Sequence, residues 1–445
     1  MGEGWRDVLL QDVAKDVTVG HVGAMASEYV AEGIPFLRSQ NVEPLRINTA
    51  DLKFIASSFH ERLKNSALSP GDVVIVRTGK PGACAVIPNS LPVANCSDLV
   101  IVRCGPELDP RFLAYYVNSV ASHHVNAHLV GAVQQHFNVA SARTLLMRLP
   151  SVREQRAIAQ TLGTLDDKME LNRRIRGTLE AMVLALFQSW FVDFDPVRAK
   201  VQGRLSGLPE PLASLFADCF EGSELGEIPK GWRVKTIEAI ATRVGMGPFG
   251  SSIKVSSFVT QGVPVISGQH LRGFVVEDTT FDFVSEGHAD RLKAANVQRG
   301  DIVFTHAGNI GQVAYIPATS RYERYVISQR QFFMRCDLAQ VTPTFVVFYF
   351  RSPQGRHRLL ANASSSGVPS IARPVTYLRS IPLTIPPKPI MDAFHQLTEP
   401  LLTQFRCSLA ESVVLEELRD TLLPKLISGA LRLKDAERMM EGANC

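Results

Sequence analysis

The sequence lacks the features of membrane, secreted and zinc-binding proteins. Its most apolar run, Phe345 to Phe350, is far too short to cross a bilayer. No apolar run follows a basic segment near Met1, so we expect no secretory signal. The seven cysteines are odd in number and show neither CxxC nor Cys/His ligand spacing, which favours inert thiols over disulfides or zinc. These absences predict a cytoplasmic protein without a membrane segment or a metal site.

Motifs for catalysis are also missing. The chain has no P-loop, no HExxH, no nucleophile elbow, and no Asn-Pro-Pro or Asp-Pro-Pro aromatic motif of an amino-methyltransferase. The segment Gly245 to Gly250 satisfies the GxGxxG spacing, but a proline interrupts it and no helical pattern follows, so we do not expect dinucleotide binding. Asp193 and Asp195 form an acidic pair without a third ligand nearby. We therefore predict no catalytic and no metal-binding residues.

Charge is scarce overall and uneven along the chain. The net formal charge is only +4. Residues 231–380 carry 17 Lys and Arg against 9 Asp and Glu, whereas residues 1–150 carry 13 of each kind. Because neutralisation of phosphates supplies most non-specific affinity for nucleic acids, the basic segment favours a polyanionic partner. The neutral segment 1–150 counts against that interpretation.

What the sequence does contain is a long internal repeat. Residues 33–88 align without a gap to residues 262–317, at a constant offset of 229 that takes Gly33 to Gly262. A period of this length corresponds to a whole domain rather than to the unit of a solenoid. Two similar modules in one chain suit a target with two similar halves, of which duplex DNA is the obvious case.

Each repeat is expected to consist of strands and turns, followed by a long helix. Residues 71–88 and their copy 300–317 predict a buried strand, a glycine-rich turn and a second strand. After each repeat, apolar residues recur at spacings of four and three, the pattern of a helix that packs against a partner helix. The predicted fold class is α+β, a tandem duplication of a mixed strand-and-turn domain in which a long helix follows each copy.

The long helices carry the residues predicted to form the helical seam and to dock partners. The first helix is expected from about residue 153 to 189, and the second after the prolines at 386–389. The apolar seam of the first comprises Ile158, Leu162, Leu165, Met169, Asn172, Ile175, Leu179, Met182 and Leu186. The apolar seam of the second comprises Phe394, Leu397, Leu401, Phe405, Leu415, Leu418 and Leu422. Asn172 either fixes the register of the pair or lies at a solvated edge. The candidates for seam and docking roles are Asn172, Trp190, Phe191, Phe194 and Leu422.

Polar residues at the turn tips differ between the copies while the framework persists. Such differences are what two modules reading different base sequences need, although neutral drift explains any single difference equally well. The candidate DNA-binding residues of the first repeat are Arg38, Gln40, Asn41, Arg77, Thr78, Lys80, Gln135, His136 and Asn138. Those of the second are Gln269, His270, Thr305, His306, Asn309, Gln329, Arg330 and Arg373. Gln40 and Gln269 occur at the same offset, which favours a shared loop or phosphate contact over base reading.

Several segments resemble the specificity subunit of type I restriction-modification systems. They are Trp190-Phe-Val-Asp-Phe-Asp-Pro-Val197, Leu225-Gly-Glu-Ile-Pro-Lys-Gly-Trp232 and Leu418-Arg-Asp-Thr-Leu-Leu-Pro-Lys-Leu-Ile-Ser-Gly429, together with Glu154-Gln155 and Glu170-Leu-Asn172. The similarity covers nearly the whole chain. The second helix departs from the pattern, because it lacks a Glu-Gln opening and has Cys407-Ser408 where the family often has an Asn-like register position.

The resemblance implies a non-catalytic DNA-specificity subunit that reads a bipartite duplex site. Residues 1–150 and 229–385 would be target recognition domains, and 151–197 and 386–432 would be long helices that pair as an antiparallel coiled coil. Residues 198–228 would be a linker, and 433–445 a tail. The implied partners are double-stranded DNA, modification (methyltransferase) subunits and a restriction (translocase-nuclease) subunit. S-adenosylmethionine, ATP and magnesium would belong to those partner subunits, with no cofactor on this chain.

Two other functions compete with this interpretation. A tandem adaptor that binds protein or RNA would also need two similar modules, but would show little preference for duplex DNA. An autonomous nuclease is disfavoured, because the sequence lacks an acidic metal-binding cluster.

Overall fold

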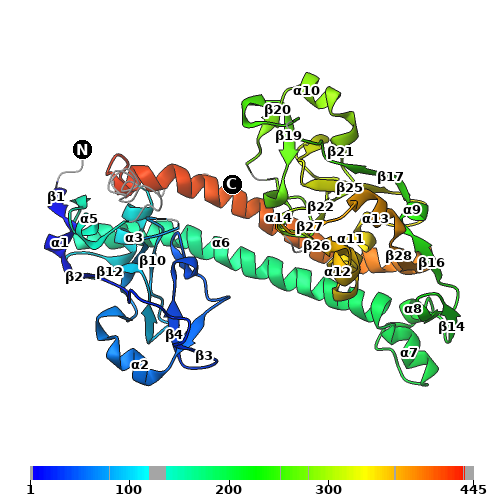
Figure 1. The fold of residues 1–445 in the computed structure, drawn as a ribbon, viewed down its shortest axis with the longest axis horizontal. Helices are drawn as coiled ribbons and strands as arrows, with labels where there is room; N and C mark the ends of the chain where they lie inside the picture. Colours follow the sequence, from blue (N-terminus) through cyan, green and yellow to red (C-terminus); the bar gives the residue numbers. More distant parts are fainter. Residues whose placement is uncertain are drawn as a thin grey trace. The chain divides into compact units, whose positions relative to one another are not determined.

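A computed structural model describes residues 4–79, 81–119, 137–250, 252–278, 280–364, 367–433 and 435. The chain divides into two compact units, one of Met1–Glu170 with Val414–Cys445 and the other of Leu171–Val413 (Figure 1). Each unit contains one repeat and a part of both long helices, α6 (Val152–Phe187) and α14 (Lys388–Ile427). Among the described residues, none of the helices combines the length and apolar character needed to cross a bilayer.

The first unit contains two sheets of short strands. The four-stranded sheet has the order β10 (Cys84–Val86), β9 (Val73–Val76), β12 (Leu99–Cys104), β2 (Ala14–Val19). The five-stranded sheet has the order β3 (Tyr29–Val30), β7 (Lys53–Ile55), β4 (Ile34–Leu37), β11 (Ala94–Cys96), β8 (Ala67–Leu68). Strand β9 is a run of four buried β-branched residues, which suits a central strand covered on both faces.

Short helices and two small strand pairs complete the first unit. The helices are α1 (Leu10–Val13), η1 (Ser39–Asn41), α2 (Ser57–Arg62), η2 (Lys64–Ser66), α3 (Pro110–Asn118) and α5 (Val139–Arg143). The strand pairs are β1 (Arg6–Leu9) with β13 (Leu146–Leu149), and β5 (Val42–Glu43) with β6 (Arg46–Ile47). Helix α3 starts at a proline, and the Asp109 side chain accepts hydrogen bonds from the Arg111 and Phe112 amides. Pro at the first position and Asp at the N-cap are the residues that favour a helix start there.

The second unit repeats the order of both sheets of the first unit. Its four-stranded sheet has the order β17 (Ala241–Met246), β25 (Gln331–Cys336), β22 (Asp301–Thr305), β23 (Val313–Tyr315). Its five-stranded sheet has the order β18 (Phe258–Val259), β20 (Phe283–Val284), β19 (Val263–Ile266), β24 (Arg324–Ile327), β21 (Asn296–Gln298). A pair of β16 (Arg233–Thr236) and β28 (Pro382–Ile385) corresponds to β1 and β13. The predicted tandem duplication is therefore confirmed at the level of topology.

The remaining elements of the second unit are short. Its helices are η3, a π-helical turn (Gln188–Val192), α7 (Asp195–Val201), α8 (Glu210–Ala213), α9 (Ile237–Ile240), η4 (Val255–Ser257), η5 (Gly268–His270), α10 (Glu286–Arg291), η6 (Lys293–Ala295), α11 (Pro343–Arg351), α12 (Pro353–Leu360) and α13 (Pro374–Ser380). Its further strand pairs are β14 (Phe220–Ser223) with β15 (Gly226–Pro229), and β26 (Ala363–Ser364) with β27 (Ser370–Ile371). The GxGxxG segment begins in β17, and a loop rather than a long helix follows it. This geometry does not suit a dinucleotide-binding turn.

Within each unit, the parts of helices α6 and α14 that belong to it run antiparallel. In the second unit, Asn172 donates to Glu411 at 2.7 Å, and the Arg176 guanidinium donates to the Ser408 carbonyl at 3.0 Å. Further along α6, the rings of Phe187 and Phe394 lie 5.9 Å apart. In the first unit, Ile158, Leu162 and Leu165 of α6 share a core with Leu422 and Leu426 of α14. The predicted seam residue Leu422 is fully buried in that core.

Asn172 occupies a central position in the helical pair. Its side chain is buried, and the Ser408 hydroxyl donates to its backbone carbonyl at 3.3 Å. The prediction of a solvated edge is therefore wrong, and the register-fixing alternative agrees with this contact. An offset of 236, which takes Val152 to Lys388 at the two helix starts, also takes Asn172 to Ser408. Equivalent residues of the two copies thus meet, one as Asn and the other as Ser.

The buried stripe of α6 differs from the predicted seam beyond Asn172. Met182 is 47% exposed, whereas Val183 and Phe187 are fully buried. An α-helix has 3.6 residues per turn and drifts away from a strict 3.5-residue repeat, so the buried positions move along the sequence. On α14, Leu397 is 41% exposed, whereas Thr398 and Leu402 are buried.

The aromatic residues after α6 pack inside the second unit. Trp190, Phe191 and Phe194 are 1%, 5% and 9% exposed. The Trp190 ring meets Phe216 edge to face at 5.1 Å, and Phe194 meets Trp232 in the same way at 5.4 Å. The predicted docking role for these three rings needs correction, because their surface is already covered by the chain itself. Burial of large aromatic rings contributes strongly to a core.

Candidate nucleic-acid interface

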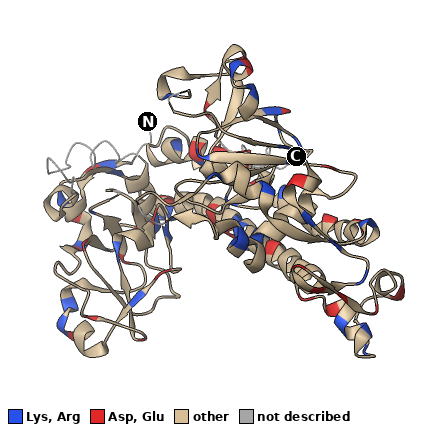
Figure 2. Ribbon diagram, turned by 45° about the vertical axis from the view of Figure 1, so that its right-hand side comes forward, with Lys and Arg blue, Asp and Glu red and all other residues tan. Residues whose placement is uncertain are grey.

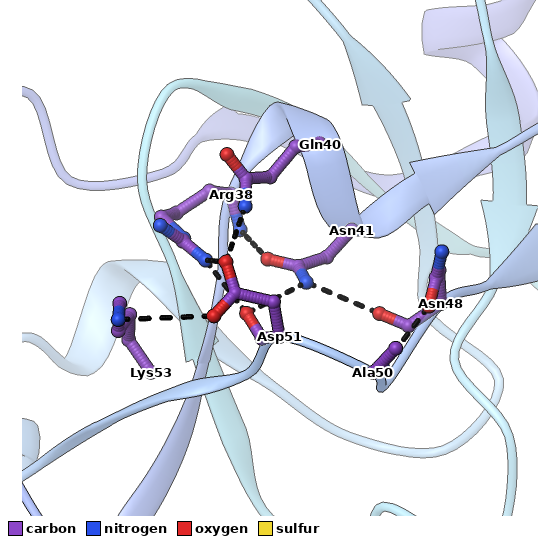
Figure 3. Close-up of polar contacts among 7 residues, drawn as sticks. All are labelled: Arg38, Gln40, Asn41, Asn48, Ala50, Asp51 and Lys53. Atoms are coloured by element: carbon purple, nitrogen blue, oxygen red, sulfur yellow. Dashed lines mark hydrogen bonds and ion pairs between the residues drawn. The ribbon is translucent and has the colours of Figure 1, made fainter. Parts of the chain in front are cut away.

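In the first unit, a cluster of polar side chains gathers around Asp51 (Figure 3). The Arg38 guanidinium donates to the Asp51 carboxylate at 3.0 Å and to its carbonyl at 2.6 Å. The exposed Gln40 amide donates to the same carboxylate at 2.8 Å, and the Lys53 ammonium lies 3.7 Å from it. The hydrogen bond from Arg38, followed by the charge of Lys53, lowers the pKa of Asp51. An ionised Asp51 therefore holds two cations and an amide at one loop.

Asn41 has a different place from its neighbours in that loop. Its side chain is 2% exposed, and its Oδ1 accepts from the Arg38 backbone amide at 3.0 Å. Its Nδ2 donates to the Asn48 carbonyl at 3.1 Å and approaches the Asp51 carbonyl at 3.4 Å. These bonds occupy the amide inside the loop, which suits loop support better than contact with a base.

Arg77 and Thr78 follow strand β9 and share one carboxylate. The Arg77 guanidinium donates to Asp98 Oδ1 at 2.7 Å, and the Thr78 hydroxyl donates to Asp98 Oδ2 at 3.1 Å. The Arg77 side chain is 19% exposed, and its buried Nε has no hydrogen-bond partner among the described residues. Asp98 therefore orients the arginine while part of the guanidinium stays accessible.

Of the four other candidates of the first repeat, one caps a helix and three lie outside the described residues. The Asn138 side chain caps α5 by accepting from the Ser141 amide at 2.8 Å, which is an ordinary N-cap role. Lys80, Gln135 and His136 lie outside the described residues.

In the second unit, His270 takes the position that Asn41 has in the first. The imidazole is 1% exposed and stacks on Phe281, with ring centres 4.3 Å apart. Its Nδ1 accepts from the Ser267 backbone amide at 3.0 Å, and its Nε2 lies 3.2 Å from the Thr280 carbonyl. Burial lowers the pKa of His270, so the neutral imidazole is favoured.

Three further candidates of the second repeat are held by nearby loops. Thr305 is 2% exposed, and its hydroxyl donates to Gln312 Oε1 at 3.1 Å. His306 Nε2 lies 3.0 Å from the Gln329 carbonyl, and burial lowers the pKa of this histidine. The Gln329 amide donates to the Ile253 carbonyl at 3.0 Å. Thr305 and Gln329 thus connect loops, and His306 is half-buried among them.

Four candidates of the second repeat have exposed side chains. They are Gln269, Asn309, Arg330 and Arg373. Asn309 lies between Gly308 and Gly311, whose φ angles of 84° and 82° need glycine. Arg373 itself has a φ of 45°, a strained value for a residue with a side chain. These tips are the parts of the second repeat most able to touch a ligand.

A basic hollow beside Asn309 was missed by the sequence analysis. It has a volume of about 390 Å³, and its lining includes Asn309, Arg272, Arg351 and Arg356. Arg351 is paired with Glu180 on α6, whereas Arg272 and Arg356 are exposed. At the offset of 229, Arg272 replaces an acidic residue of the first copy, Glu43. This reversal of charge between the copies is the feature of the sequence that could have indicated the basic hollow.

Charge over the structure is mixed in sign, and metal ligands do not converge. Figure 2 shows basic and acidic positions interspersed along the ribbon. Within the described ranges, no group of three or more His, Cys, Asp or Glu is placed to hold a metal ion. The acidic pair of the sequence has local partners, since Asp193 accepts from Gln188 at 2.9 Å and Asp195 accepts from Ser189 at 2.8 Å.

Comparisons with known proteins bear on the predicted resemblance. No family model matches the sequence. The chain is 26% identical over 298 residues to the type I restriction enzyme MjaIX specificity subunit of Methanocaldococcus jannaschii, a match that spans 64% of this chain and 60% of that protein. It is also 26% identical over 337 residues to the type I restriction enzyme HindI specificity subunit of Haemophilus influenzae, spanning 65% of this chain and 70% of that protein.

The fold is similar to that of a solved structure whose description names the same kind of subunit. The crystal structure of the type I restriction-modification system S subunit from M. genitalium matches with a TM-score of 0.52 and 15% identity, covering 95% of this chain and 96% of that one. The resemblance to type I specificity subunits is therefore confirmed, and the predicted fold class agrees with this neighbour. Both curated relatives are named specificity subunits, and the prediction of a non-catalytic chain agrees with that description.

Proposed function

We propose that this chain is the DNA-specificity subunit of a type I restriction-modification complex and reads a bipartite duplex site. The observation that carries the proposal is one recognition topology present twice, with different side chains at equivalent loop tips. In the first copy the tip after β9 presents Arg77, and in the second the equivalent hairpin presents Asn309. Arg suits recognition of guanine and Asn suits adenine, so two such modules can read different half-sites.

Phosphate contacts are proposed for cations that lie beside these tips. Arg272 and Arg356 line the basic hollow next to Asn309, and their exposed guanidinium groups can approach a polyanion. In the first unit, Arg38 and Lys53 lie around Asp51 and are candidates for the same role. Such contacts would fix the position of each module on the duplex without carrying sequence information.

The proposed partners are double-stranded DNA, modification (methyltransferase) subunits and a restriction (translocase-nuclease) subunit, in the cytoplasm. S-adenosylmethionine, ATP and magnesium are assigned to those partners. Because Trp190, Phe191 and Phe194 are buried, docking of partner subunits is assigned to exposed positions of the long helices, such as Leu171 and Met182. A tandem adaptor for protein or RNA is the alternative, and it predicts no preference for a duplex sequence.

The recognition of two half-sites can be tested by mapping methylated adenines in the host genome with and without this chain. We expect one motif made of two short specified blocks separated by unspecified bases, with the block centres about 34 Å, or one helical turn, apart. A continuous motif without a gap would contradict the architecture. Loss of this chain without any change in methylation would favour the adaptor alternative.

Base and phosphate contacts can be separated with two arginine substitutions in the assembled complex. We expect Arg77→Ala to weaken binding to the cognate duplex by roughly 1 to 3 kcal/mol, with little change on a scrambled duplex. Arg272→Ala is the matched comparison and should weaken both duplexes alike, lowering the salt slope by about one unit. Competition binding at two salt concentrations measures both effects. Unchanged affinity and salt slope for Arg77→Ala would remove that side chain from the interface.

A further inference from the structure

The two recognition loops are closed by the same device built from different side chains. In the first copy, Asn41 Oδ1 accepts from the backbone amide three residues earlier, at 3.0 Å. In the second copy, His270 Nδ1 accepts from the backbone amide three residues earlier, also at 3.0 Å. Both acceptor atoms stand at the δ position, three bonds from Cα, so Asn and His can place them alike. The offset of 229 takes Asn41 to His270.

The donor nitrogens of the two side chains also have equivalent partners. Asn41 Nδ2 approaches the Asp51 carbonyl at 3.4 Å, and His270 Nε2 approaches the Thr280 carbonyl at 3.2 Å. The same offset of 229 takes Asp51 to Thr280. The backbone carbonyls of both residues also accept equivalent amides, from Asn48 at 2.8 Å and from Glu277 at 3.0 Å. On each side chain, the acceptor closes its own loop, and the donor nitrogen faces the carbonyl of a second chain segment.

The hydrogen bonds of His270 define its protonation state. A backbone N–H donates to Nδ1, so Nδ1 must carry a lone pair rather than a proton. A carbonyl faces Nε2, so the proton belongs there. The Ser267 hydroxyl, 3.3 Å from Nδ1, can donate to the same lone pair. A proton added to Nδ1 would place two donors against each other and leave a buried amide without an acceptor.

We propose that His270 is a positioning residue for the second recognition loop, that it works only as the neutral Nε2–H imidazole, and that its first-copy counterpart Asn41 does the same work without titrating. The proposal rests on the proposed function for its DNA consequences, but the loop clip itself does not. It predicts that acidification opens the loop of one module and leaves the other closed. Binding of the second half-site should then be lost selectively at low pH.

The charges around the imidazole come from neighbouring segments. Asp282 favours a proton on the ring, Arg272 opposes it, and desolvation by burial is larger than either, which lowers the pKa of His270. Glu277, whose amide bonds the His270 carbonyl, has its own pKa raised by burial. The Gln269 side-chain amide lies 3.4 Å from His270 Nε2 and adds no formal charge, and with an Nε2–H it must turn its oxygen, not its nitrogen, toward the ring. The ordinary pKa of histidine is 6.5, and the pKa of His270 in the folded loop is lower. As the pH falls, the unfolded chain therefore binds a proton at a higher pH than the folded loop does.

The sign of the pH effect follows because the pKa of His270 is lower in the folded than in the unfolded chain. Between the ordinary value of 6.5 and the lower pKa of the folded state, the unfolded loop binds more protons than the folded loop. The contribution of His270 is therefore fully present above 6.5 and is lost as the pH falls through this window. Asn41 has no such dependence, because a carboxamide does not titrate in this range.

The loop clip can be tested without DNA in the full-length chain. Nitrogen NMR of histidine-labelled protein at about pH 7.5 should show His270 as the neutral Nε2–H form. Hydrogen exchange of the Ser267 amide should accelerate about tenfold in His270→Ala, because the amide loses its buried acceptor. His270→Asn should restore protection at every pH, and His288→Asn, outside the clip, should change nothing. A proton on Nδ1 at about pH 7.5, or no protection by Asn over Ala, would overturn the proposal.

The consequence for recognition can be tested in the assembled complex with duplexes altered in one half-site. On lowering the pH from about 7.5 to about 5.5, the wild type should lose about tenfold in discrimination at the second half-site only. His270→Asn should abolish that loss, and Asn41→His should create it at the first half-site. Equal loss at both half-sites in all variants would overturn the selective role of His270. If hydrogen exchange of the Ser267 amide behaved as expected but the complex showed no preference for any duplex sequence, the loop clip would stand and the proposed function would be rejected.

Discussion

Trp190→Ala is expected to lower the free energy of unfolding of the second unit by about 3 to 5 kcal/mol, the usual cost of removing a fully buried aromatic ring. Trp190 is 1% exposed, and its ring meets Phe216 at 5.1 Å and Phe394 at 5.9 Å. These neighbours come from distant segments, so they cannot easily close over the cavity. Urea unfolding followed by circular dichroism measures the change.

The matched control for that substitution lies on the preceding helix. Met182 of α6 is 47% exposed, so Met182→Ala should change stability by no more than about 0.5 kcal/mol. If Trp190→Ala instead left stability unchanged and weakened partner binding, the ring would have the docking role first predicted for it. The comparison therefore separates a core residue from a docking residue.

The framework of the fold was predictable because the chain carries it twice. Residues 71–88 predicted a strand, a glycine turn and a strand, and the structure has β9 and β10 joined by Gly79 and Gly82 with φ angles of 90° and 91°. Only glycine takes such angles easily, so its recurrence in the copy marks a requirement of the backbone. The seam beyond Asn172 was not predictable from a strict heptad, because the helix drifts relative to that repeat.

The candidate site was predictable by residue type but not by role. Asn41, His270 and Thr305 are polar residues that the sequence placed at turns, which is the pattern of exposed recognition groups, yet each is buried and its side chain bonds nearby groups of the chain. Sequence spacing cannot say whether a polar side chain points to solvent or bonds a nearby backbone amide, because either arrangement satisfies its hydrogen-bonding capacity. The hollow lined by Arg272 forms only in the folded chain, and the sequence offered only the change from Glu43 to Arg272 between the copies as a sign of it.

Exchange of residues 233–385 for the equivalent segment of a related chain is expected to change one half-site of the recognised sequence and leave the other as it was. Strands β16 and β28 begin and end this segment and pair with each other, Arg233 with Ile385 and Thr236 with Pro382. The ends of the module are therefore adjacent, which is the arrangement that tolerates replacement of a whole domain. Recognition of the original second half-site should fall on the order of a thousandfold, because several base pairs lose their contacts together.

The choice of donor segment and control follows from the packing. Phe345 lies inside the exchanged segment and packs on Phe187 and Phe191 outside it, at 5.4 and 5.1 Å, so the donor should keep an aromatic residue there. Exchange of residues 6–149, which β1 and β13 close in the same way, is the reciprocal control and should alter only the first half-site. Sequencing of methylated sites in each hybrid gives the result directly. If each module contacts only its own bases, exchange of one module can alter only the half-site that it contacts. A hybrid in which both half-sites changed together would therefore show that the two modules do not read independently.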